Sequence, residues 1–296
     1  MVIACFFRFH VGVICVYLWI SICISADSSQ TGRGGGISLI SNKLKRLFLP
    51  SIIFSTAYYC LFCDITGWRD FVYSIINGCG HMWFLPMLFW CFIGGWILEQ
   101  IQIRDTWKML FLICLNLLCV LSLPLQLNSA IKFMAFFYGG YVVFKHIDEI
   151  KTNITPKRLL LGWIVFFILF AFLRSIRDYL VFTEENSSLY KCFMIVGDRA
   201  CQLIYASIGL MMFYCSALFY VQRHQLIPFI LKMSSFCFGV YLFQQFVLQI
   251  LYYKTSFPIL VGPYWLPWFG FVIAIIVSYL LSDFFLRTRL GKFLIG

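Results

Sequence analysis

The chain has 296 residues, of which 62% are hydrophobic and only 12% are charged, about half the charged share of a soluble domain. No soluble fold of this length hides so much apolar surface, so the composition predicts a polytopic membrane protein. A net charge of +11 would suggest nucleic acid binding in a soluble protein, but here basic loops on the cytoplasmic side of a membrane account for it, and no nucleic acid partner is expected. The thirteen cysteines lack paired metal-type spacing and mostly fall in apolar runs, so neither a disulfide framework nor a metal site is predicted.

Crossing a bilayer core of roughly 30 Å takes about 20 mostly apolar residues. Nine windows meet this requirement, at residues 9–26, 48–65, 82–98, 107–127, 130–147, 159–174, 201–221, 234–253 and 268–286. The predicted fold is therefore an all-α, polytopic transmembrane helix bundle, with residues 1–296 forming a single membrane-embedded domain. The long 174–200 connection mixes both charges and is expected to be an exposed loop, either a recognition loop or a solvated connector.

The distribution of Lys and Arg predicts the orientation. Alternate connections carry fifteen of these residues and the other connections carry eight, so the richer side is expected to be cytoplasmic. This puts the C-terminus in the cytoplasm of a multi-pass protein of the cell's inner (plasma) membrane. His81 then falls near the outer end of its span, and the basic residues Lys43, Lys45 and Arg46 fall at the inner face.

The first window is open to two interpretations. Residues 1–26 form either a retained helix or a signal peptide that ends near Ala26. A retained helix is favoured, because the following stretch from Asp27 to Arg46 is basic and would otherwise be exported. The N-terminus would then lie outside without a leader, which predicts that one further span is missing upstream of Met1.

Four segments carry the most specific patterns. Aromatic, glycine and basic residues recur in Lys43–Pro50, Gly80–Pro86, Phe136–Tyr141 and Phe238–Gln244. In this order and at these spacings, they resemble the acyltransferase 3 family of bacterial integral membrane enzymes, which O-acylate surface and exported glycans. The resemblance covers most of the chain, from about residue 40 to the C-terminus.

The resemblance implies transfer of an acyl group, with acetyl expected, from acetyl-CoA or another acyl-CoA to a hydroxyl of a surface polysaccharide or lipid-linked sugar. Two departures accompany it. Family members usually have ten spans and begin with a helix that carries Arg, ten residues and then His, whereas here Trp19 follows Arg8 at that spacing. The chain is thus expected to lack the family's first helix, and its activity depends on whether that helix exists. Gln244 stands where many members have a His.

The residues themselves suggest roles for this chemistry. Lys43, Lys45 and Arg46 suit the phosphates of the donor. His81 is the histidine that best suits a base for the acceptor hydroxyl. Four further residues are predicted to contact the substrate in a partly apolar channel: Trp83, Tyr138, Tyr141 and Gln244. No metal is expected.

Each assignment has a structural alternative. The basic residues suit an ordinary positive-inside anchor, His81 suits a helix cap, and the aromatic residues suit packing or an interfacial belt. At the level of the whole chain, a transporter or flippase for a lipid-linked glycan remains open, and so does an inactive remnant or scaffold of the same family.

Overall fold

The computed structural model describes residues 36–64, 67–118, 123–182, 188–223 and 228–295, and within these ranges every regular element is a helix. The elements are α2 (Gly36–Lys43), η1 (Leu44–Phe48), α3 (Leu49–Phe62), α4 (Trp68–Asn77), η2 (Gly80–Trp83), α5 (Phe84–Gln100), α6 (Asp105–Leu118), α7 (Leu127–Lys145), α8 (Ile147–Asn153), α9 (Pro156–Phe182), α10 (Ser188–Arg223), α11 (Pro228–Tyr253), α12 (Phe257–Val261), α13 (Leu266–Arg287) and α14 (Arg289–Ile295). The predicted all-α polytopic bundle is confirmed.

Six of the described helical segments are long and apolar enough to cross a membrane. They are Gly80–Gln100, Leu127–Lys145, Pro156–Ile176, Met194–Arg223, Phe236–Tyr253 and Leu266–Arg287. The window predicted at 48–65 lies on α3 and the one at 107–127 on α6, each a helix of 14 residues. The first window, and with it the question of a missing first helix, lies outside the described residues.

The predicted 174–200 loop is wrong. Helix α9 continues to Phe182 and α10 begins at Ser188, so helix occupies most of that stretch. Mixed charges did not end the helices, because Arg, Lys and Glu all have good helix propensity. The Arg199 guanidinium, expected in the loop, donates to the backbone carbonyls of Asn116 and Leu117 on α6 at 3.4 Å each.

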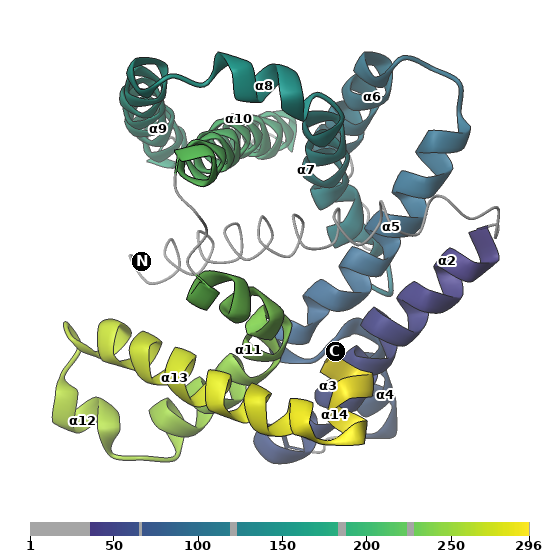
Figure 1. Ribbon diagram of the computed structural model, residues 1–296, viewed down its shortest axis with the longest axis vertical. Coiled ribbons are helices and arrows are strands. Elements are labelled where there is room, and N and C mark those ends of the chain that lie inside the picture. Colours follow the sequence, from purple (N-terminus) through teal and green to yellow (C-terminus); the bar gives the residue numbers. More distant parts are fainter. Residues whose placement is uncertain (1–35, 65–66, 119–122, 183–187, 224–227, 296) are drawn as a thin grey trace.

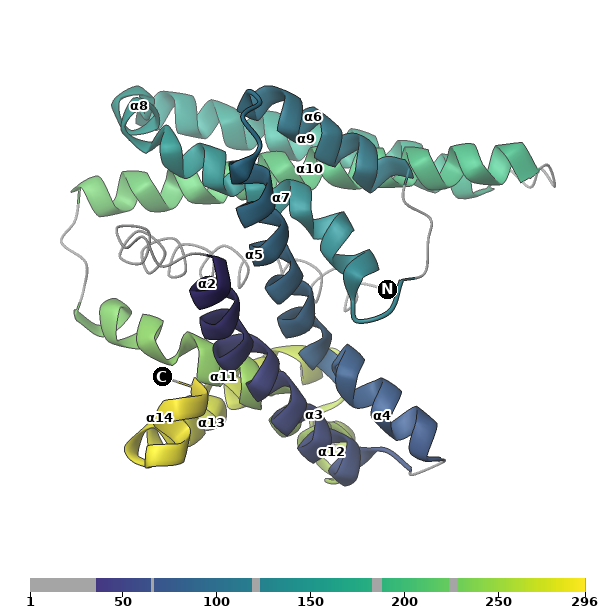
Figure 2. The same cartoon turned by 90° about the vertical axis from the view of Figure 1, so that its right-hand side faces the viewer.

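Helices α5 and α7 connect two groups of elements (Figures 1 and 2). One group holds α6, α8, α9 and α10; the other holds α3, α4, α11, α12, α13 and α14. The larger core lies in the second group, where Met82, Leu85 and Leu242 are completely buried between η2, α5 and α11. This core therefore holds the segment around His81 in place.

Helices α11 and α13 pack closely through small residues. Gly270, Ala274, Ser278 and Ser282 are buried and recur every fourth position of α13, so they form one stripe along it. A Cβ atom added to Gly239 of α11 would clash with the Ser282 hydroxyl. Large side chains of α13 such as Phe284 are exposed instead. Small residues at the contact and large apolar residues outside are typical of helices in lipid.

Candidate functional site

His81 is held by a reciprocal pair of hydrogen bonds with Tyr241. Its Nε2 lies 3.0 Å from the backbone carbonyl oxygen of Tyr241, and the Tyr241 hydroxyl donates to the carbonyl oxygen of His81 at 2.6 Å. Because a carbonyl only accepts, Nε2 carries the ring proton and the neutral ring has its lone pair on Nδ1. Nδ1 is shielded from solvent and has no hydrogen-bond partner among the described residues.

Two more polar residues complete what we call the His81 cluster, consisting of Tyr58, His81, Tyr241 and Gln249. The Tyr58 ring lies edge-on to the imidazole, with 6.3 Å between ring centroids, and the Gln249 side-chain amide donates to the Tyr58 hydroxyl at 2.8 Å. Tyr241 and Gln249 stand eight positions apart, which places both on one face of α11. Three segments distant in the sequence thus meet at the imidazole.

A glycine turn positions His81. Gly78 and Gly80 have φ values of +81° and +62°, a region that side chains with a Cβ rarely adopt. A Cβ atom at Gly80 would also lie 2.9 Å from the Tyr58 ring. The turn ends α4, starts η2 and brings the imidazole against Tyr58.

Lys43 reaches the middle of α5 rather than its end. Its ammonium lies 4.0 Å from the ring centroid of Phe92, the central residue of α5. Phe92 stands eleven positions after His81, which corresponds to about 16 Å along a helix axis. The Lys43 ammonium, from α2, therefore lies at the mid-length of α5, and His81 lies just before the first residue of α5.

The basic segment has an unusual backbone. Leu44–Phe48 forms a π-helical turn in which the Leu49 N–H donates to the Leu44 carbonyl. Pro50 has no N–H, and its ring crowds the carbonyl four residues earlier, so a wider turn before it relieves the strain. Helix thus continues from Gly36 to Phe62, while the Lys45 and Arg46 side chains in the π turn are exposed.

Tyr138 and Tyr141 belong to a different polar cluster. Tyr138 is buried and its hydroxyl donates to Glu99 Oε1 at 2.7 Å and Asp105 Oδ1 at 3.0 Å, while Tyr141 donates to Glu99 Oε2 at 3.1 Å. Two lysines balance the charge: Lys108 lies 3.6 Å from Glu99, and Lys145 lies 2.9 Å from Asp105. We call these six residues, from α5, α6 and α7, the Glu99 cluster. Both tyrosines therefore lie near the C-terminal end of α5, whereas His81 lies just before its N-terminal end.

Two other predicted substrate residues lie nearer to His81. Trp83 is half-buried and packs against Phe84 and Phe133, with ring centroids 6.2 Å and 6.0 Å away. Gln244 is half-buried on α11, whereas the neighbouring Gln245 and the more distant Gln249 hydrogen-bond the Tyr58 hydroxyl. Sequence reasoning missed Tyr58 and Gln249, although the spacing of Gln249 from Tyr241 places them on one helix face.

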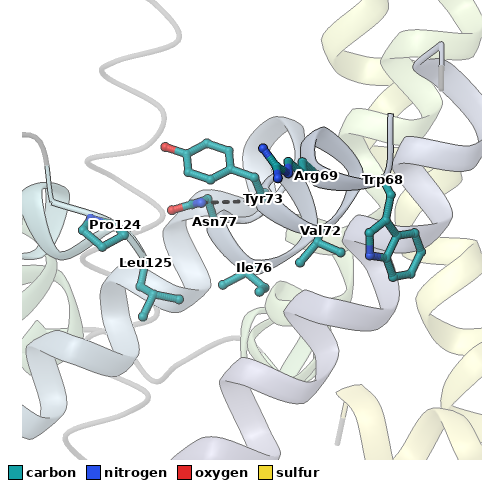
Figure 3. A pocket seen from close by; sticks show the side chains of 8 residues that line it. All are labelled: Trp68, Arg69, Val72, Tyr73, Ile76, Asn77, Pro124 and Leu125. Carbon is teal, nitrogen blue, oxygen red and sulfur yellow. Dashed lines mark hydrogen bonds between the residues drawn. The ribbon is translucent and has the colours of Figure 1, made fainter. Parts of the chain in front are cut away.

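A pocket of about 450 Å³ lies beside α4 (Figure 3). Trp68, Arg69, Val72, Tyr73, Ile76 and Asn77 line it from α4, and Pro124 and Leu125 line it from the turn before α7. Leu125 and Gln126 both have positive φ values, near 60°, although neither is glycine. The indole N–H of Trp90 donates to the Leu125 carbonyl at 2.9 Å and so ties this strained turn to α5.

The Glu99 cluster and the His81 cluster also differ in the charge of their side chains. A hydrogen bond from Lys145 lowers the pKa of the Asp105 carboxyl below its ordinary value, and the hydrogen bond from Tyr138 acts in the same direction. The Glu99 cluster is thus a network of ionised carboxylates and ammonium groups with satisfied hydrogen bonds, suited to joining α5, α6 and α7. The His81 cluster is neutral and contains an imidazole nitrogen with no described partner.

Comparison with known proteins gives one match. The family described as "Acyltransferase domain" matches residues 4–287, nearly the whole chain. No curated protein and no solved structure matches.

Proposed function

The chain belongs to the acyltransferase 3 family, and we propose that it moves an acyl group, with acetyl as the expected one, from acyl-CoA to a hydroxyl of a surface polysaccharide or lipid-linked sugar. The observation that carries this proposal is the geometry of His81. Its Nε2 proton is engaged by Tyr241, and its Nδ1 is shielded, without a described partner and in the correct tautomer to accept a proton. A general base needs such a lone pair near the proton that it removes.

The proposed reaction follows from that nitrogen. The acceptor hydroxyl donates its proton to Nδ1 while its oxygen attacks the carbonyl carbon of the thioester. The carbon–sulfur bond breaks, the thiolate of coenzyme A leaves with the bonding electrons, and the proton on Nδ1 passes to it. The hydrogen bonds with Tyr241 hold the imidazole in place, and the groups that cover Nδ1 must move aside for the acceptor hydroxyl to reach it.

Lys43, Lys45 and Arg46 are the proposed donor site. An ammonium in the middle of a span is costly unless it is paired or functional. Phe92 supplies part of the compensation for Lys43 through a cation–π contact, usually worth about 0.5–2 kcal/mol. The exposed Lys45 and Arg46 are then available for the phosphates of coenzyme A, and they follow Lys43 on a helical stretch that runs beside α5 from Phe92 toward His81.

The pocket beside α4 is the proposed acceptor site. Trp68 and Tyr73 are 75% and 66% exposed, and aromatic faces of this kind stack on sugar rings. Arg69 adds a cation for an acidic sugar or a lipid-linked phosphate, and Asn77 adds an amide. Asn77 precedes His81 by four positions in the sequence, and the glycine turn joins the helix that lines the pocket to the segment that carries the proposed base. The Lys and Arg residues on alternate loops support an inner-membrane protein with a cytoplasmic C-terminus. In that orientation the pocket lies on the outer side of the membrane.

A transfer assay on the full chain in liposomes tests the proposal, with radiolabelled acetyl-CoA on one side and exported glycan on the other. His81→Gln keeps a donor for the Tyr241 carbonyl but lacks a proton acceptor, so the transfer rate should fall by about 100-fold or more. His146→Gln is the matched control, since His146 is exposed at the end of α7. A His81→Gln rate equal to that of the control would contradict the role of His81. Glycan movement across the bilayer without acylation would favour a transporter instead.

A further inference from the structure

Two cysteines lie in contact at the end of the bundle that holds His81. Cys63 is the first residue after α3 and Cys79 is the last before η2, and their sulfur atoms are 3.9 Å apart. Both side chains are partly accessible. The segment between them contains α4 and Gly78, so a bond between these sulfurs would close a loop around one wall of the pocket.

The backbone keeps this pair together. The Cys63 N–H donates to the Tyr59 carbonyl at 3.0 Å, and the Cys79 N–H donates to the hydroxyl of the buried Ser55 at 3.1 Å. Both cysteines are therefore fixed to the last turns of α3. A disulfide has a sulfur–sulfur distance of about 2.05 Å, so the two atoms must approach by about 2 Å, a shift that side-chain rotation can supply.

We propose that Cys63 and Cys79 form a disulfide that fixes the glycine turn, and with it His81, to the end of α3. The proposal rests on the topology given under the proposed function, which puts both residues on the outer, oxidising side of the membrane. If both residues lay on the cytoplasmic side instead, the reducing environment there would keep both thiols free.

The oxidant is the disulfide of a thiol–disulfide oxidoreductase. Burial and the neighbouring Cys63 raise the pKa of Cys79 to about 12, so exchange starts at the other sulfur. The Cys63 thiolate attacks the oxidoreductase disulfide, forming a mixed disulfide and releasing one oxidoreductase thiolate. Cys79 then loses its proton and attacks Cys63 Sγ, which expels the second thiolate. Two electrons pass to the oxidoreductase, which becomes a dithiol, and two protons leave the cysteines.

Differential alkylation of the full chain in intact cells tests this. Acid-quenched, denatured protein is treated with N-ethylmaleimide, reduced, and treated with an isotopically heavy maleimide before peptide mass spectrometry. Cys63 and Cys79 should carry the heavy label in more than half of the molecules, whereas Cys60, exposed one turn earlier on α3, should carry the light one. Cys79→Ser should convert Cys63 to the light label, and Cys60→Ser should change nothing.

Light label on both Cys63 and Cys79, or a heavy label on Cys63 that persists in Cys79→Ser, overturns the proposal. The readout does not depend on acyl transfer. Free thiols in a chain that transfers acyl groups would overturn the disulfide alone, and a linked pair in a chain without transferase activity would overturn only the proposed function. Reduction of the linked protein should lower its melting temperature by about 5 °C, and Cys63→Ser should show no such change.

Discussion

Tyr241 holds both the ring and the backbone of His81, although 160 positions separate them in the sequence. Its carbonyl oxygen accepts a hydrogen bond from the Nε2–H of the imidazole, and its hydroxyl donates to the His81 carbonyl oxygen. Each residue belongs to a segment that carries the family resemblance. The structure therefore explains why a glycine–histidine turn and a distant Phe-Gly-Val-Tyr helix occur together: one carries the imidazole, and the other fixes its tautomer and orientation.

Tyr241→Phe should weaken this arrangement. The variant keeps the ring but leaves the His81 carbonyl without its donor, which should cost about 1–2 kcal/mol of unfolding free energy. The acyl transfer rate should fall as well, because the turn that carries the imidazole loosens. Thermal unfolding in detergent and the transfer assay measure the two effects. Tyr253→Phe, on the same helix with an exposed ring, is the control, and equal behaviour of the two variants would contradict the positioning role.

Gly80→Ala tests the turn. A side chain at φ +62° costs roughly 1–2 kcal/mol, and the added Cβ must also displace the Tyr58 ring. The variant should therefore melt several degrees below the wild type and lose transfer activity. Gly197→Ala is the matched control, because its Cβ would meet nothing within 4 Å and alanine suits a helix. A Gly80→Ala protein as stable as that control would show that the turn is not required.

Lys43→Met tests the donor site. Methionine can still pack on Phe92 but carries no charge, so the KM for acyl-CoA should rise by about 10-fold or more, as expected for loss of a charge-assisted contact. Lys254→Met, at the exposed end of α11, should leave the KM unchanged. If Lys43 serves only as an anchor for topology, both variants will have the wild-type KM, and steady-state kinetics at varied acyl-CoA will show it.

The Glu99 cluster predicts a dependence of stability on pH. The pKa of Asp105 lies below the ordinary 3.8 in the folded chain, chiefly because of the hydrogen bond from Lys145. A lowered carboxyl pKa stabilises the fold above the ordinary pKa, and this stabilisation is lost as the pH falls through the folded pKa. Lys145→Met should therefore lower the melting temperature at about pH 6, and the difference from wild type should shrink below about pH 4.

Lys151→Met is the control for that experiment. Lys151 pairs with Asp148 at 3.0 Å on exposed α8, and such surface pairs contribute little. Its melting temperature should match the wild type at every pH. A Lys145→Met difference that stays constant down to about pH 3 would mean that the ammonium stabilises the chain through something other than the Asp105 carboxylate.

The helical fold was predictable because membrane spans are encoded locally. Long apolar runs must form helices in lipid, where every backbone polar group needs an internal partner. The extent of each helix was less predictable. The charged stretch after Arg174 is mostly helix and not the predicted loop, and helix begins at Gly36, before the predicted span at Phe48, because propensity and charge say little about where packing extends a helix.

The sequence by itself determined the fold class and the family, since apolar runs and short motifs are readable one segment at a time. Only the tertiary structure decided which residues meet. It joined His81 to Tyr58, Tyr241 and Gln249, assigned Tyr138 and Tyr141 to Glu99, and brought Cys63 to Cys79. The physical reason is that the sequence pattern gives the face of a helix a side chain occupies, whereas the partner across that face depends on how helices distant in the chain pack together.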